Sequence, residues 1–331
     1  MRKIYLSALA LMIGAISFAQ NNKSTVVQDG VDGTSTVSQD GSSNNAIQYQ
    51  DGTTNIVGIV QKGNGNYANQ NQRDNQAPGN WAHASNIATI KQIGNGNKAW
   101  QTQTYLLKTA LAEQTGNNNE SRQTQSGFAT DAKTYQSGNS NKATQNQAST
   151  ADNAYIRQPG NSNVAIQNQI GGRYNNVEAV QSGNGNRSNQ TQKGYASGGD
   201  RNIAKVNQSG NSNRAVQDQS NPGNIHALFP SNVAEIYQSA DGGNAVQHQY
   251  GTDGYQKIDQ RNGGSNYGYQ YQDAASELGD ATLLQNGSGN WSQQWQYGMN
   301  NSSDVNQTGN SMWSKVTQYG SGNSNTVVQT N

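Results

Sequence analysis

Residues 86–103 read NIATIKQIGNGNKAWQTQ, two short segments joined by a turn rich in glycine and asparagine. In both segments, small, apolar or amide side chains occupy every second position, which is the period of a β-strand. Gly94 and Gly96 in the turn can adopt positive φ angles at no steric cost. The stretch therefore predicts two strands of about seven residues separated by a turn of about four.

A glutamine closes each segment and returns every eleven residues through most of the chain. The residue two places before it is aliphatic in one segment and glutamine in the next, and these two classes alternate almost without interruption. The aliphatic class includes Ile59, Ile90, Ile156, Val206, Ile236, Ile258, Leu283 and Val305, and the amide class includes Gln48, Gln70, Gln101, Gln123, Gln145, Gln167, Gln190, Gln217, Gln247, Gln270 and Gln294. The full repeat is therefore 22 residues long, with one strand of each class and two turns.

This pattern predicts an all-β chain, a β-solenoid of strand-turn-strand rungs that form two facing parallel sheets in a cross-β arrangement. We expect about a dozen rungs, each packed against its neighbours. An eleven-residue period can also indicate a right-handed helical coiled coil, but glycine and asparagine in every unit disfavour helix. Residues 105–113 fit the strand template poorly and place Lys108 at an inward position, so a local helix is open for this segment.

The chain divides into a predicted signal peptide and one repeat domain. Residues 1–19 combine a basic start, an apolar run and a terminal Ala19, which predicts a secretory signal and an extracellular location for the mature protein. Residues 20–331 form the predicted solenoid. Loop insertions interrupt the period near 73–86, 193–202 and 220–232. All three follow an amide strand, so we expect them at one edge of the solenoid.

Composition argues against several classes of function. Charged residues make up 12% of the chain, the formal net charge is +1, and Lys and Arg are dispersed, so no basic stripe is available for nucleic acid. No segment after the signal approaches the roughly 20 apolar residues of a membrane span. Without cysteine, stability has to come from backbone pairing and packing. No group of acids, bases or metal ligands stands out, so we expect neither an enzyme nor a cofactor or metal.

The repeated amides predict the chemistry of the core. Stacked rungs place each inward side chain about 4.8 Å from its copy in the next rung. An amide in such a column can donate its N–H to the carbonyl of the next copy, so repetition satisfies a buried polar group. Alanines let the sheets approach closely. The predicted ladder residues of the fibre core are Gln61, Asn66, Ala68, Gln72, Gln92, Asn97, Ala99, Gln103, Asn141, Ala143, Gln147, Gln158, Asn163, Ala165, Gln169, Gln208, Asn213, Ala215 and Gln219.

The unit Gln158-x-Gly160-x-x-Asn163-x-Ala165-x-x-x-Gln169 and its sister units resemble the curlin repeat of curli fibre subunits, the secreted functional amyloids of bacterial biofilm matrix. The resemblance covers nearly the whole chain after residue 19. It implies a curlin-type solenoid that polymerises into extracellular fibres for adhesion and biofilm cohesion. It also implies partners, namely a nucleator or sister subunit and an outer-membrane export system. This chain has more rungs than the familiar subunits and an additional inward glutamine, and the resemblance fits a main subunit or a nucleator.

Both ends of the repeat array keep the strand template. Val26 and Gln28 stand in the first unit, Val327 and Gln329 stand in the last, and residues 319–331 contain neither charge nor proline. An unprotected strand edge at each end favours pairing with another copy. We therefore expect a head-to-tail homopolymer with these four residues at the assembly ends.

A monomeric ice-binding or surface-display β-solenoid adhesin is the alternative function. Ice binding requires a regular outward array, whereas the outward positions here mix Lys, Trp, Thr, Glu, Arg and Tyr. The outward aromatic residues either bind a ligand or pack against one another, and the sequence leaves both open. They include Trp100, Trp291, Trp295, Trp313, Tyr267, Tyr269 and Tyr271.

Overall fold

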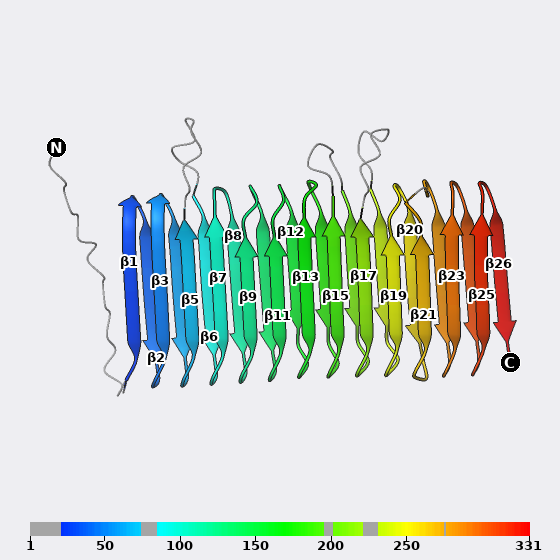
Figure 1. Ribbon diagram of the computed structural model, residues 1–331. Helices are drawn as coiled ribbons and strands as arrows, with labels where there is room; N and C mark the ends of the chain where they lie inside the picture. Colours follow the sequence, from blue (N-terminus) through cyan, green and yellow to red (C-terminus); the bar gives the residue numbers. More distant parts are fainter. Residues whose placement is uncertain (1–20, 74–84, 195–200, 221–230, 275) are drawn as a thin grey trace.

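The computed structural model describes residues 21–73, 85–194, 201–220, 231–274 and 276–331. These residues form twenty-six β-strands and no helix. Odd-numbered strands make one 13-stranded sheet and even-numbered strands make a second. The predicted all-β solenoid of two parallel sheets is confirmed, and it has thirteen rungs (Figure 1).

We name each sheet after the residue class of its inward column. The amide sheet consists of β1 (Lys23–Val31), β3 (Asn45–Thr53), β5 (Tyr67–Arg73), β7 (Lys98–Thr104), β9 (Glu120–Gln125), β11 (Lys142–Gln147), β13 (Val164–Ile170), β15 (Arg187–Lys193), β17 (Arg214–Ser220), β19 (Asn244–Gln249), β21 (Tyr267–Gln272), β23 (Trp291–Tyr297) and β25 (Trp313–Tyr319). The aliphatic sheet consists of β2 (Thr34–Asp40), β4 (Ile56–Lys62), β6 (Ile87–Ile93), β8 (Thr109–Thr115), β10 (Asp131–Ser137), β12 (Asn153–Gln158), β14 (Asn176–Gln181), β16 (Ile203–Gln208), β18 (Val233–Gln238), β20 (Tyr255–Arg261), β22 (Asp280–Asn286), β24 (Ser302–Thr308) and β26 (Ser324–Thr330).

Neighbouring strands pair in a parallel register that stacks like residue on like residue. Gln28 of β1 pairs with Gln50 of β3, and the same column continues strand by strand along the sheet. The register survives the insertions, since Gln72 and Gln103 still pair although 31 residues separate them. Inward hydrophobic and amide side chains therefore fix the register, because a slip of one residue would turn all of them outward.

The connections between strands fall at two opposite edges of the solenoid. Odd strands run in one direction and even strands in the other (Figure 1). Short turns link each even strand to the next odd strand. The insertions link β5 to β6, β15 to β16 and β17 to β18, all at the opposite edge. Their central residues 74–84, 195–200 and 221–230, like the predicted signal peptide 1–19, lie outside the described residues.

Glycine is required where the backbones of successive short turns approach closely. Gly63 has a φ of 107°, and a Cβ at this position would lie 2.2 Å from the carbonyl oxygen of Gly94 in the next rung. Gly65 in the same turn has a φ of 66° but no atom near the place of a Cβ. The first glycine is thus fixed by both sterics and backbone angle, and the second by backbone angle alone.

The local helix considered for residues 105–113 is wrong. Tyr105 and Leu107 adopt positive φ angles in a turn, and strand β8 begins at Thr109. Pairing with β6 and β10 on both sides gives the backbone of β8 its hydrogen-bond partners, which outweighs the helix propensity of its Leu, Ala and Glu residues. The inward position of Lys108 is confirmed, because this residue is 1% exposed.

A thin core fills the space between the sheets. Ile59 and Ile90 of the aliphatic sheet pack with Ala68 and Ala99 of the amide sheet in one apolar cluster. Val206, Ile236, Ile258, Leu283 and Val305 continue the column in a second cluster nearer the C-terminus. Buried amides occupy the remaining inward positions, so the solenoid depends on hydrogen bonding as well as on apolar contact.

Candidate assembly core and end surfaces

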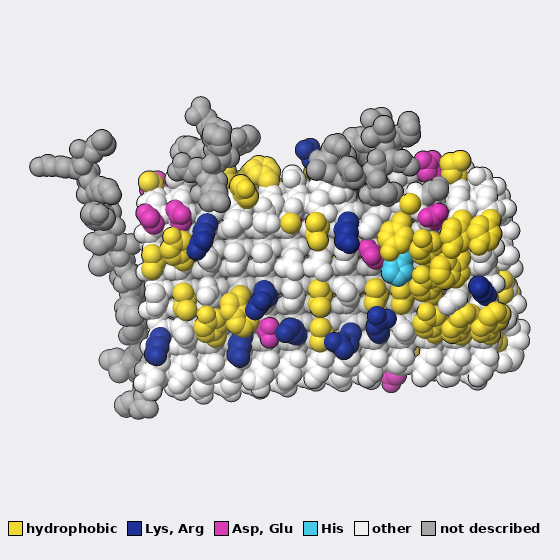
Figure 2. Space-filling model, in the orientation of Figure 1, with side chains coloured by type: hydrophobic (Ala, Val, Ile, Leu, Met, Phe, Trp, Pro, Cys, Tyr) yellow, Lys and Arg dark blue, Asp and Glu magenta, His cyan; other side chains and the backbone are white. Residues whose placement is uncertain are grey.

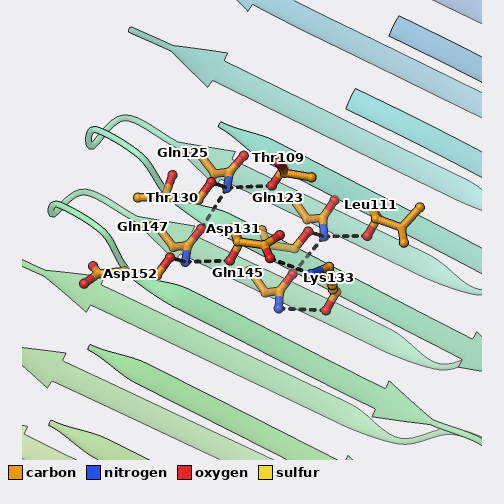
Figure 3. A network of polar contacts seen from close by, with 11 residues as sticks. Thr109, Leu111, Gln123, Gln125, Thr130, Asp131, Lys133, Gln145, Gln147 and Asp152 are labelled. Carbon is orange, nitrogen blue, oxygen red and sulfur yellow. Dashed lines mark hydrogen bonds and ion pairs between the residues drawn. The ribbon is translucent and has the colours of Figure 1, made fainter. Parts of the chain in front are cut away.

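Glutamine side chains form hydrogen-bonded columns along the solenoid axis. In the amide sheet, Gln123 Nε2 donates to Gln145 Oε1 at 2.9 Å, and Gln125 Nε2 donates to Gln147 Oε1 at 2.9 Å (Figure 3). A third column runs through the aliphatic sheet, where Gln92 Nε2 donates to Gln114 Oε1 at 2.8 Å. In each of these bonds the donor lies in the rung nearer the N-terminus. The columns are therefore polar, with N–H groups directed towards the C-terminal end.

The same Nε2 atoms hold the two sheets together. Gln123 Nε2 also donates to Leu111 O of β8 at 2.9 Å, and Gln125 Nε2 donates to Thr109 O at 3.0 Å (Figure 3). A primary amide has two N–H groups, so one bond can run along the axis and the other across to the facing sheet. The Nε2 groups of these glutamines are thus satisfied without water, as burial of polar groups requires.

The residues that the sequence singled out as a ladder all lie between the sheets. Each of them is at most 1% exposed. The structure places Gln61, Gln92, Gln158 and Gln208 on the aliphatic sheet, and Ala68, Gln72, Ala99, Gln103, Ala143, Gln147, Ala165, Gln169, Ala215 and Gln219 on the amide sheet. Asn66, Asn97, Asn141, Asn163 and Asn213 immediately precede strands of the amide sheet.

These buried asparagines bind mainly backbone rather than one another. Asn66 Oδ1 accepts the backbone N–H of Asn97 at 3.0 Å, and Asn66 Nδ2 donates to Gly94 O at 2.8 Å. Both contacts reach the short turn of the next rung. The asparagine column therefore clamps successive turns together, which adds a side-chain-to-backbone bond that amide stacking alone does not supply.

Sequence reasoning missed a second asparagine column on the outside of the short turns. Asn64 donates its backbone N–H to Asn95 Oδ1 at 2.9 Å, and Asn95 donates to Asn117 Oδ1 at 3.0 Å. The column continues through Asn139, Asn161, Asn184 and Asn211. The signal was the recurrence of asparagine after the first turn glycine, a pattern that is also typical of an ordinary tight turn.

Three successive rungs of the aliphatic sheet replace the buried asparagine by other residues. Lys108, Thr130 and Asp152 are at most 2% exposed and stand where Asn86 and Asn175 stand in neighbouring rungs. Lys108 Nζ donates to Leu106 O at 3.3 Å, whereas Thr130 Oγ1 has no hydrogen-bond partner among the described residues.

Asp152 places a carboxyl group in this buried column. Burial raises the pKa of Asp152 to about 7, although Asn175 donates its backbone N–H to Asp152 Oδ1 at 3.0 Å and thereby opposes the rise. Ser149 Oγ donates to the other carboxyl oxygen. The charged form is therefore disfavoured in the folded rung.

Both end rungs present open strand edges. β1 pairs only with β3 and β2 only with β4, while β25 pairs only with β23 and β26 only with β24. Of the four end residues predicted from sequence, Val26 and Gln28 lie on β1, and Val327 and Gln329 lie on β26. Those strands belong to different sheets. Sequence reasoning therefore missed the second strand of each end, which carries Val37 and Gln39 on β2 and Val316 and Gln318 on β25.

The glutamine columns end with complementary groups at the two ends. Gln28 Nε2 donates to Gln50 Oε1 at 2.6 Å, and no described residue donates to the Oε1 of Gln28. At the other end, Gln329 Nε2 donates to Trp313 O at 2.9 Å but to no further glutamine among the described residues. The N-terminal end thus offers amide acceptors, and the C-terminal end offers a donor on β26, whereas Gln318 Nε2 on β25 already donates to Ser302 O and Asn323 O.

Outward aromatic rings gather near the C-terminal end of the amide sheet (Figure 2). Trp291 and Trp313 stack with centroids 5.2 Å apart and an interplanar angle of 2°, and Tyr297 and Tyr319 stack at 4.9 Å and 9°. The rings thus pack along the axis, one rung on the next. Trp313 and Tyr319 remain 60% and 72% exposed because their rung is the last of this sheet.

Nothing in the described part of the chain gathers three potential metal ligands from histidine, cysteine, aspartate or glutamate. The same residues include no helix with the length and apolar character of a membrane span.

A family model for the curlin associated repeat matches residues 280–309. The match runs through β22, β23 and β24 and the two short turns that link them. The chain therefore contains a curlin associated repeat. The same strand lengths and glutamine columns recur in the other rungs, so the geometry of the matched repeat extends through both sheets. A search of curated proteins gives no match. The curlin repeat and the two-sheet solenoid fit a curli-like structural protein.

Proposed function

We propose that this curlin-repeat protein is the subunit of an extracellular curli-like amyloid fibre, and that stacking of one copy on the next is its activity. The observation that carries the proposal is the polarity of the glutamine columns, which end in free acceptors at β1 and β2 and in a donor at β26, where Gln329 Nε2 bonds only to Trp313 O. Such surfaces complement each other but not themselves. Association is therefore head-to-tail and open, which produces filaments rather than closed dimers.

The C-terminal open edges carry little of the usual protection against edge pairing, while β1 and β2 at the other end carry the outward charges Lys23, Asp29 and Asp40. Soluble sheet proteins place prolines, bulges or inward charges on their edge strands. Strands β25 and β26 contain no proline, and their single charge, Lys315, lies on the outward face. Repeat proteins that stay monomeric end in polar capping units, whereas the end rungs here keep the full strand-turn-strand form.

Location and partners form part of the same proposal. The signal peptide predicted at residues 1–19 and the curlin repeat support secretion, with adhesion and biofilm cohesion as the role of the fibre. Export through a dedicated outer-membrane system and initiation by a nucleator or sister subunit follow from the resemblance to curli subunits.

The alternative of an ice-binding monomer lacks a supporting surface. Successive rungs of the aliphatic sheet present Thr89, Leu111, Lys133, Tyr155 and Glu178 in one outward column. A regular ice-binding array would repeat one residue type. The test below separates the two functions, because an ice binder remains monomeric.

A single proline at the free edge tests the proposal. Ser302 donates its backbone N–H to Asn323 O, so the odd-numbered residues of β26 bond to β24 and the even-numbered residues face the open edge. Val328→Pro therefore removes an outward N–H and places the ring where the next copy would pair, without breaking a bond inside the chain. Val328→Thr is the matched control, since it keeps the N–H and the strand propensity.

Fibre growth from short parent seeds gives the result. We expect the parent and Val328→Thr to elongate the seeds without a lag, at a rate that rises with protein concentration, into thioflavin-positive, detergent-resistant filaments. Val328→Pro can still dock through its N-terminal end, so small amounts of it should stop growth of parent fibres at one end. Equal elongation by the proline variant, or a parent protein that stays monomeric, would refute the proposed function.

A further inference from the structure

The central column of the amide sheet changes residue type at its two ends. Glutamine occupies this position in every strand from β3 to β23, but Val26 occupies it in β1 and Val316 in β25. The facing column of the aliphatic sheet also ends in valine, with Val37 in β2 and Val327 in β26. Each end rung therefore carries a pair of inward valines.

These valines lie at the two ends of the core. Val26, Val37 and Val327 are partly open to solvent at the free edges, whereas Val316 is only 4% exposed. Val316 packs in the apolar cluster that contains Leu283 and Val305, and Val327 packs against the same cluster. Val37 packs against the cluster at the other end, and Val26 is 36% exposed.

Continuation of the register inside the chain determines what a second copy would bring to each position. If Gln28 of the next copy pairs with Gln318, its β1 extends the amide sheet, and Val26 then lies beside Val316. Its β2 likewise extends the aliphatic sheet beside β26, so that Val37 lies beside Val327. The joint would place four valines together, bordered by the glutamine columns.

Valine suits an end rung better than glutamine does. A glutamine in this column is buried and relies on the next rung for one hydrogen bond, so in a free subunit an end glutamine would leave an amide unpaired. A valine has no polar group that could be left unpaired. Its apolar surface is exposed to water only until a second copy covers it. Joining thus becomes favourable through apolar burial, while the outer glutamine columns keep the register.

The outward side of the same joint offers a second contact. One face of Trp313 is covered by Trp291, and its opposite face points to the open edge. In the continued register, Lys23 of the next copy lies beside Trp313. The chain already contains this contact between adjacent rungs, since Arg122 Cζ lies 5.3 Å from the ring centroid of Trp100, with which it pairs. A cation over a tryptophan face is attractive.

We infer that these residues form a joint specific for a second copy of this chain, with a buried four-valine plug and a Lys23–Trp313 contact on the surface. The inference rests on the proposed head-to-tail assembly and adds what selects the partner. A first rung that carried glutamine in place of Val26 would leave an amide carbonyl unpaired beside Val316 and so would fit the end less well.

A mutant cycle on the plug tests the inference through the critical concentration of seeded fibres. Val316→Gln buries an amide N–H opposite Val26, and Val26→Gln buries a carbonyl opposite Val316, so each should raise the critical concentration about tenfold. The double variant restores a complete glutamine column across the joint and should return close to the parent value. Every internal strand of the amide sheet carries glutamine at this position, so both variants are compatible with the fold.

The surface contact is tested in the same assay. Lys23→Gln should raise the critical concentration about two- to fivefold, while Lys98→Gln, in the same column within the chain, serves as the control and should leave it unchanged. The Lys23 effect should vanish in a Trp313→Leu background. If the parent forms fibres and the single variants have the same critical concentration as the parent, the proposed joint is wrong. If the parent forms no fibres, the proposed function is wrong.

Discussion

Replacement of Asp152 by asparagine restores the residue that this column carries in neighbouring rungs. Asp152 is fully buried before β12, and its Oδ1 accepts the backbone N–H of Asn175. Asp152→Asn keeps that acceptor. It also provides an Nδ2 donor like that of Asn232, which reaches Gly251 O at 2.8 Å. We expect the variant to stabilise the rung at neutral pH, because it removes a carboxyl that must ionise without water.

The magnitude follows from the pKa of Asp152, which burial raises from 3.8 to about 7. Each pKa unit corresponds to about 1.4 kcal/mol, so ionisation of this carboxyl costs the folded rung about 4 kcal/mol at pH 8 and about 2 kcal/mol at pH 5.5. The folded rung holds its proton more tightly than the unfolded chain does. Its stability is therefore greatest below about pH 4 and falls as the pH rises from about 4 to about 7.

Hydrogen exchange on assembled fibres measures this local effect, because each rung of a solenoid contacts only its neighbours and can open separately. Exchange in peptides that cover β12 should quicken in the parent between pH 4 and pH 8, after correction for the intrinsic rate. In Asp152→Asn the same peptides should show nearly constant protection.

Glu178→Gln is the matched control, because it neutralises an outward acid on β14, the next strand of the same sheet. It should leave the exchange of β12 unchanged at both pH values. Equal protection of parent and Asp152→Asn at pH 8 would show that this rung tolerates the charge and that the reasoning is wrong.

Three further predictions concern the amide columns, the short turns and the aromatic patch. Gln145→Ala leaves Gln123 Nε2 without its axial acceptor and should lower the free energy of unfolding of nearby rungs by about 1–3 kcal/mol. The outward Thr144→Ala is the control and should change this free energy little. Similar hydrogen exchange in the two variants would contradict the role of the column. Gly63→Ala should keep adjacent turns from stacking in register, whereas Gly65→Ala should lower the free energy of unfolding by only about 1 kcal/mol. The rate of seeded fibre growth compares the two variants, and equal rates would refute the role of the close backbone approach at Gly63. Burial raises the pKa of Tyr269 to about 12, so the difference in ultraviolet absorbance between parent and Tyr269→Phe should titrate near pH 12 rather than near pH 10, and protection of this rung should fall as the pH rises above 10.

Much of the fold follows from the sequence because each rung repeats the same chemistry. Period two, the returning glutamine and the two strand classes fixed the sheets and the inward columns, since only one register keeps all of these side chains inside. The local helix considered at residues 105–113 failed for the converse reason. There the local propensity of β8 favours helix, whereas pairing with its two neighbouring strands stabilises a β-strand.

The end surfaces were predicted only in part. Val26 and Val316 stand where the amide sheet otherwise has glutamine. The residue pattern alone therefore could not assign β1 and β25 to the amide sheet. The outer asparagine column was missed since its residues are exposed and fit an ordinary turn. Its role is visible only when Asn64 and Asn95 are seen in successive turns.

Mass per length of single unbundled fibres tests the stacking of whole solenoids most directly. Thirteen rungs at about 4.8 Å give one chain for every 62 Å or so. With a chain mass of 35.4 kDa, this corresponds to about 0.6 kDa per Å. A fibre in which each chain fills a single 4.8 Å layer would weigh roughly thirteen times as much per unit length. Dark-field electron microscopy should give the lower value, and the higher value would contradict end-to-end assembly of the folded rungs.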